Sequence, residues 1–162
     1  MPLDRPRILR GALAGAVAST VWWAQQRADM RAFGVPYDDA QLLGTGVLPG
    51  APDRVSGPVG VALHVANGAL FGAVYAHVAP RVPLPAWARG PAAGLGEHLA
   101  SWPAVTLVDR FHPARERLPA LSGNRAAFAQ ATWRHLLFGV VLGELERRLN
   151  APDPGTPAQR SS

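Results

Sequence analysis

The sequence contains no cysteine and no lysine, and these two absences exclude several kinds of chemistry. Without cysteine the chain has no disulfide, no thiolate ligand for a metal and no cysteine nucleophile. Without lysine it forms no Schiff base and lacks the lysine of phosphate-binding loops. Charge is also sparse, because only 17% of the 162 residues are Asp, Glu, Lys or Arg. The composition therefore indicates a single, apolar domain.

Every basic residue is an arginine, and the 16 arginines give a net charge of +5 at pH 7. They are scattered through the termini and the connections and form no patch interleaved with aromatic residues, so nucleic-acid binding is not expected. Contact with anionic lipid headgroups explains the positive excess more simply. The expected partners are therefore a lipid bilayer and its headgroups, with no nucleic acid.

Four apolar stretches are each long enough to cross a bilayer, which takes about 20 residues. Mean hydropathy is only +0.05 because the charged residues lie mostly in the connections, while Ala, Gly, Val and Leu fill the stretches. A soluble, Ala-rich helical bundle is the alternative, but its helices would carry charge along one face at every turn. We predict an all-α, four-helix transmembrane bundle over residues 1–149, with spans at about 8–26, 57–79, 90–108 and 126–146.

Turn and cap residues set the expected helix boundaries. The first helix is predicted to run on to Phe33 and to end at Gly34. In the long connection that follows, Asp38 is a candidate N-cap for a short surface helix. Asn124 is the candidate N-cap of the last helix. The tail at 150–162 is rich in Pro, Ser and Gly and is predicted to be disordered.

Small residues recur at every fourth position of several spans, which allows helix backbones to approach closely in lipid. The pattern His-x3-Gly-x3-Gly occurs twice, beginning at His64 and at His135, and each copy follows a span with a Gly-x2-Ala-Gly start. This repetition suggests two duplicated helical hairpins. The glycines assigned to helix packing are Gly11, Gly15, Gly68, Gly72, Gly139 and Gly143.

A polar centre is predicted where three histidines from different spans reach the same depth. At about 1.5 Å per residue, antiparallel helices bring these histidines within about one turn of one level. Ionisable groups at that depth are costly and are usually paired or functional. The residues of this cluster are His64, Asn67, Glu97, His98, Arg134 and His135.

Three interpretations of the cluster are open. In the first, Glu97 pairs with Arg134 or with a histidine, and the other groups hydrogen-bond between helices as structural contacts. In the second, Glu97 and the histidines carry protons or bind a small solute in an internal cavity. In the third, His64, His98 and His135 ligate zinc or iron, although no close-set metal-binding motif is present. No cofactor is expected.

Four features of the sequence together match a known family pattern. They are the segment Gly11-Ala12-Leu13-Ala14-Gly15, the run from His64 through Phe71, Tyr75 and Pro80 to Trp87 and Gly90, the spacing His98-x4-Pro103, and the ending from His135 to Arg147-Arg148. In these features the chain resembles the YagU-like family of small bacterial inner-membrane proteins. The resemblance implies a multi-pass protein of the bacterial inner (plasma) membrane that is associated with acid resistance. The first connection, at 34–56, departs from the family pattern in composition and length.

The leading functional hypothesis is a non-enzymatic membrane protein that handles protons or a small solute through the polar centre. No nucleophile stands beside a base in the sequence pattern, so no catalytic residue is assigned. A scaffold or subunit of a larger membrane complex is the main alternative, because the glycine stripes are suited to pack against partner helices. A homo-oligomer is left open, and a metal-binding membrane protein is the further alternative.

Overall fold

The computed structural model of the protein describes residues 4–151, and this part of the chain contains helices and no strands. The prediction of an all-α fold is confirmed for these residues. The tail predicted at 150–162 lies outside them except for Asn150 and Ala151. The helices are α1 (Arg5–Phe33), α2 (Asp39–Val47), α3 (Asp53–Val78), α4 (Ala86–Ser101), α5 (Val105–Phe111) and α6 (Arg125–Leu149), with 3-10 turns at Ala79–Arg81, Trp102–Ala104 and Arg115–Arg117.

Capping side chains fix the helix ends that the sequence predicted. The carboxylate of Asp38 accepts a hydrogen bond from the Gln41 amide at the start of α2, at 3.0 Å. Asn124 caps α6 in the same way by accepting from the amide of Ala127. Gly34 ends α1 with a φ of 68°, a left-handed conformation that glycine adopts without a steric penalty. These three predictions are confirmed.

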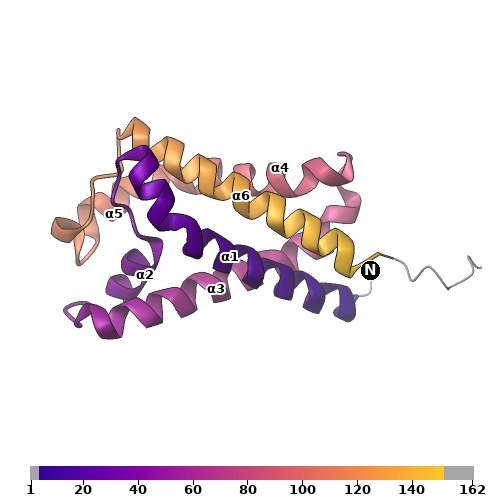
Figure 1. The fold of residues 1–162 in the computed structure, drawn as a ribbon, viewed down its shortest axis with the longest axis horizontal. Coiled ribbons are helices and arrows are strands. Elements are labelled where there is room, and N and C mark those ends of the chain that lie inside the picture. Colours follow the sequence, from indigo (N-terminus) through magenta and orange to yellow (C-terminus); the bar gives the residue numbers. More distant parts are fainter. Residues whose placement is uncertain (1–3, 152–162) are drawn as a thin grey trace, which may run out of the picture.

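The four long helices pack side by side in the order α3, α1, α6, α4, and each neighbour runs antiparallel to the next (Figure 1). α1 is central, since it packs against both α3 and α6. Its first turn is joined to the last turns of α6 by an ion pair between Arg7 and Glu146. The two ends of the described chain therefore lie on the same side of the bundle, as predicted.

Glycines allow the closest helix contacts, because no side chain separates the two backbones. A Cβ atom on Gly15 of α1 would overlap the carbonyl oxygen of Gly68 on α3. A Cβ on Gly94 of α4 would overlap the carbonyl oxygen of His135 on α6 in the same way. The sequence repeat aligns Gly15 with Gly94 but Gly68 with Gly139, so the second pair is shifted by one turn. The close glycine–carbonyl contact thus occurs in both helix pairs, but the pairing of residues is not the same in the two.

The third apolar stretch, predicted as one span at 90–108, is divided between two helices. α4 begins earlier, at Ala86, and ends at Ser101. A 3-10 turn that contains Pro103 then leads into α5. Proline lacks the amide hydrogen that an α-helix needs at an interior position, which accounts for the interruption. α4 itself is therefore shorter than the stretch suggested.

The interior of the bundle contains both apolar and polar side chains. Trp22, Tyr75, Phe138 and Leu142 belong to an apolar core and are at most 8% exposed. Ser19, Gln26, Gln130 and the guanidinium of Arg134 are buried as well, all at most 4% exposed. Large apolar side chains also lie exposed on the outer surface, and these include Leu9, Leu13, Val17, Leu63, Leu70, Val74, Leu99, Trp133 and Val140. Buried polar groups combined with so many exposed large apolar side chains are unusual in a water-soluble protein.

Among the described residues, one helical segment, Asp53–Arg81, is long and apolar enough to cross a membrane by length and composition. Its best window has a mean hydropathy of 1.5. α1 and α6 are of similar length, but charged residues lower their mean hydropathy. In α1 these include the exposed Arg10 and Arg27, and in α6 they include the buried Arg134.

Candidate functional site

A cavity of about 210 Å³ lies in the middle of the bundle. Residues of α1, α2, α3, α4 and α6 surround it, so every long helix contributes to its wall. Four of the six residues of the predicted polar centre line this cavity, namely His64, Asn67, Glu97 and His135. The cavity is thus the place where the predicted cluster can meet a solute.

Glu97 and His135 form an ion pair across the cavity wall, with Oε2 and Nε2 separated by 2.6 Å. The other ring nitrogen of His135, Nδ1, lies 2.7 Å from the carbonyl oxygen of Ala131. A carbonyl only accepts, so Nδ1 must carry a hydrogen and donate it. The short contact between Nε2 and the carboxylate then contains one further proton, which either group can hold. The pair is therefore a site for one transferable proton.

His98 lies deeper than this pair and is 1% exposed. Its ring is 4.8 Å from the ring of His135, measured between centroids. The Thr132 hydroxyl donates its hydrogen to the Phe128 carbonyl at 2.8 Å, so it must accept from Nε2 of His98, which lies 3.0 Å away. His98 is therefore held in a defined tautomer next to the Glu97–His135 pair.

The Trp22 indole contacts His64 of α3 as well as His135 of α6. The indole contacts both imidazoles edge to face, with centroids 5.2 Å from His64 and 4.7 Å from His135. Nε2 of His64 is buried and has no hydrogen-bond partner among the described residues. Buried polar atoms are rarely left without a partner, so this nitrogen is a candidate contact for a bound solute or water.

The three histidines do not converge on one point. His64 and His135 each contact the Trp22 indole, and His98 is hydrogen-bonded to a threonine. Within residues 4–151, no group of three or more His, Asp or Glu side chains is arranged to hold a metal ion. The geometry therefore gives no support to the hypothesis that His64, His98 and His135 ligate zinc or iron.

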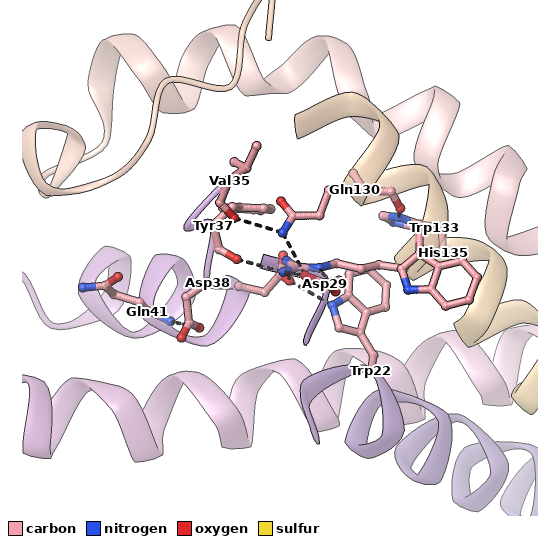
Figure 2. A network of polar contacts seen from close by, with 12 residues as sticks. Trp22, Asp29, Val35, Tyr37, Asp38, Gln41, Gln130, Trp133 and His135 are labelled. Carbon is pink, nitrogen blue, oxygen red and sulfur yellow. Dashed lines mark hydrogen bonds and ion pairs between the residues drawn. The ribbon is translucent and has the colours of Figure 1, made fainter. Parts of the chain in front are cut away.

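Arg134 does not join the Glu97 cluster, which differs from the prediction. Its guanidinium is fully buried and forms two hydrogen bonds with Asp29, at 2.6 and 2.8 Å. A third bond reaches Asp39 at 2.7 Å, and a fourth reaches the Tyr37 carbonyl at 2.9 Å (Figure 2). The arginine binds these aspartates and not Glu97, because α1 places Asp29 beside it and the connection after α1 brings Asp39 to it from the start of α2.

Asp29, Asp39 and Trp22 are the central residues that sequence reasoning missed. Asp39 accepts from the Trp22 indole at 2.9 Å, which couples the arginine network to the histidine cavity. Gln130 donates to Asp29 at 2.8 Å and to the carbonyl of Val35 at 3.1 Å (Figure 2). A signal for Asp29 was present, because it continues the buried stripe of α1 by steps of three or four residues beyond the predicted span.

Tyr37 lies where the network meets the cavity. Burial raises the pKa of its hydroxyl well above the ordinary value, and the nearby carboxylate of Asp39 raises that pKa further. The Arg134 guanidinium stacks over the ring at 5.3 Å. The hydroxyl therefore stays protonated at neutral pH, and its hydrogen is directed to the Asp39 carboxylate at the edge of the cavity.

Comparison of the chain with protein-family models, curated proteins and solved structures finds no match. The chemistry of the site consequently has to be inferred from its own geometry. That geometry combines a small polar cavity, a carboxylate and an imidazole that share a proton, and a second imidazole in ring contact behind them. Such a site can take up, hold and release a proton or bind a small polar solute.

Proposed function

We propose that the protein is a multi-pass integral membrane protein whose four long helices form a transmembrane bundle, and that it handles protons through the central cavity. The observation that carries this proposal is the Glu97–His135 pair on the wall of the cavity. A small polar solute that exchanges hydrogen bonds with the same residues is the related possibility. The protein is expected to act without catalysis, in a bacterial inner membrane.

The outer surface of the bundle supports the membrane location. Leu70 on α3 is 65% exposed, Leu13 on α1 is 56% exposed and Val140 on α6 is 53% exposed. Lipid is the solvent in which such a surface is favourable, and in lipid the helices must pack through small residues. Polar groups kept inside a bundle and paired with one another are also what a hydrocarbon environment requires.

The depth of the ionisable groups supports a path for the proton. Side-chain exposure is 39% for Glu97 and 14% for His135, and His98 is almost fully buried. A proton that enters the cavity meets the carboxylate first and the imidazole next. We propose acid stress as the setting of this activity, because the sequence resembles a family that is associated with acid resistance.

The scaffold alternative receives less support. The glycines that suggested a surface for partner helices are used within the chain, since Gly11 and Gly15 pack on α3 and Gly90 and Gly94 pack on α6. These stripes are therefore occupied, and no further glycine face on the described helices calls for a partner.

Proton uptake into proteoliposomes tests the proposal. We expect Glu97→Gln, which removes the charge and keeps the shape, to lower proton flux at least tenfold, and His98→Ala to lower it as well. The matched control is Glu116→Gln, because Glu116 is a carboxylate far out in a connection with a side chain that is 88% exposed. A flux that is the same in the wild type and in both cavity variants would refute proton handling by this site.

A further inference from the structure

A second and larger cavity, of about 1040 Å³, opens at the end of the bundle that holds α2. α1 contacts α3 closely only through the first half of α1, around Gly15 and Gly68. Beyond that point α2 takes the place of α1 and packs against α3 (Figure 1). The carbonyl of Ala40 lies directly against Gly60. The two long helices therefore diverge, and the space between them is the cavity.

The walls of this cavity change from apolar to polar along the helix axes. Trp23 and Ala24 of α1 and Val61 of α3 line the part nearer the middle of the bundle. One turn further out on α1 comes Arg27, and on the α2 side come Asp38 and Gln41. In the proposed membrane arrangement, this gradient runs from the hydrocarbon region into the headgroup region. The cavity thus suits an amphiphile rather than a fully polar or fully apolar ligand.

Two oppositely charged side chains at the polar end of the cavity can each bind a further partner. Arg27 is exposed and makes no ion pair with another described residue. Asp38 uses Oδ1 to cap α2, which leaves Oδ2 open to a second donor. Asp53, the other carboxylate of this wall, is already engaged by Arg117 at 2.6 Å. The open charges are therefore one cation and one carboxylate oxygen.

We propose that this cavity binds a zwitterionic phospholipid with a primary ammonium group, such as a phosphatidylethanolamine. Its phosphodiester pairs with Arg27, its ammonium donates to Asp38, and its acyl chains leave past Trp23 and Val61. The binding rests on the proposed membrane location and is independent of proton handling, because none of these residues belongs to the Glu97 cluster.

Native mass spectrometry of the detergent-solubilised full chain tests the binding. We expect phosphatidylethanolamine to bind about tenfold more tightly than phosphatidylcholine, which has no ammonium hydrogen, or phosphatidylglycerol, which has no cation. Glycerophosphoethanolamine, which has the headgroup without acyl chains, and inorganic phosphate are expected not to bind. Equal binding of the three lipids would mean that the lipid is bound as general annular lipid and would overturn the proposal.

Two substitutions locate the site. Arg27→Gln and Asp38→Asn are each expected to weaken phosphatidylethanolamine binding by about tenfold, and asparagine retains the capping of α2. The control is Arg31→Gln, one turn further along α1 and outside the cavity. Unchanged binding in both variants would place the lipid elsewhere. Because proton flux is measured separately with Glu97→Gln, loss of one property without the other shows which of the two proposals has failed.

Discussion

Replacing Arg134 with leucine is expected to lower the free energy of unfolding by about 3–5 kcal/mol, the cost of breaking a buried ion pair from one side. The guanidinium is completely buried between two aspartates, and Asp29 is only 3% exposed. Without the arginine both carboxylates lose their counter-charge, and the Tyr37 carbonyl loses a donor. Thermal unfolding of the purified variant in detergent micelles measures the loss.

A matched arginine on the same helix provides the control. Arg147 also makes two hydrogen bonds to a carboxylate, that of Glu144, but on the exposed surface. Surface pairs contribute about 0–1 kcal/mol, so Arg147→Leu should have little effect. Adding Asp29→Asn to Arg134→Leu should recover part of the stability, because it removes one buried negative charge that has lost its partner. Equal losses for Arg134→Leu and Arg147→Leu would show that the buried network does not stabilise the bundle.

The second large effect is expected at Gly94 of α4. Gly94→Ala adds a Cβ that overlaps the carbonyl oxygen of His135, so α4 and α6 have to move apart. Overpacking of this kind costs about 1–3 kcal/mol. It should also disturb the Glu97–His135 contact one turn away and reduce proton flux.

Gly96→Ala is the control, because it lies two residues along the same helix and its Cβ would meet nothing within 4 Å. Alanine is the better helix former, so this variant should be more stable than the wild type by about 0.5–1 kcal/mol. Thermal unfolding and flux of the two variants, measured side by side, check both statements. If Gly94→Ala were as stable as Gly96→Ala, the close approach of α4 and α6 would be disproved.

Local signals in the sequence were sufficient for the other long helices, but not for the division of the third stretch into α4 and α5, and they were sufficient for part of the site. Caps such as Asp38 and Asn124 act within three residues, and glycine stripes act along one helix face, so both can be read without tertiary information. Counting residues from the helix ends was also enough to bring Glu97 and His135 to one level. These features depend on spacing within a helix and on antiparallel order alone.

The partners of Arg134 could not be predicted in the same way. Asp39 reaches the arginine only because the connection after α1 turns back at Gly34 and lays α2 against α3. The contacts of the Trp22 indole with His64 and His135 depend likewise on the rotamer of Trp22, which no spacing rule specifies. Interactions set by the path of a connection or by a rotamer need the three-dimensional structure.

The central claim is that the outer faces of the helices contact lipid, and single-cysteine labelling tests it most directly. The chain has no cysteine of its own, so an introduced one is the only thiol. We predict that Leu13→Cys, Leu70→Cys and Val140→Cys remain unlabelled by a water-soluble maleimide in open membrane fragments, whereas Ser122→Cys in the last connection is labelled. After solubilisation in a denaturant, all four should react. Labelling of the three outward positions in membranes as fast as Ser122→Cys would contradict the account, because water would then be the solvent of these faces.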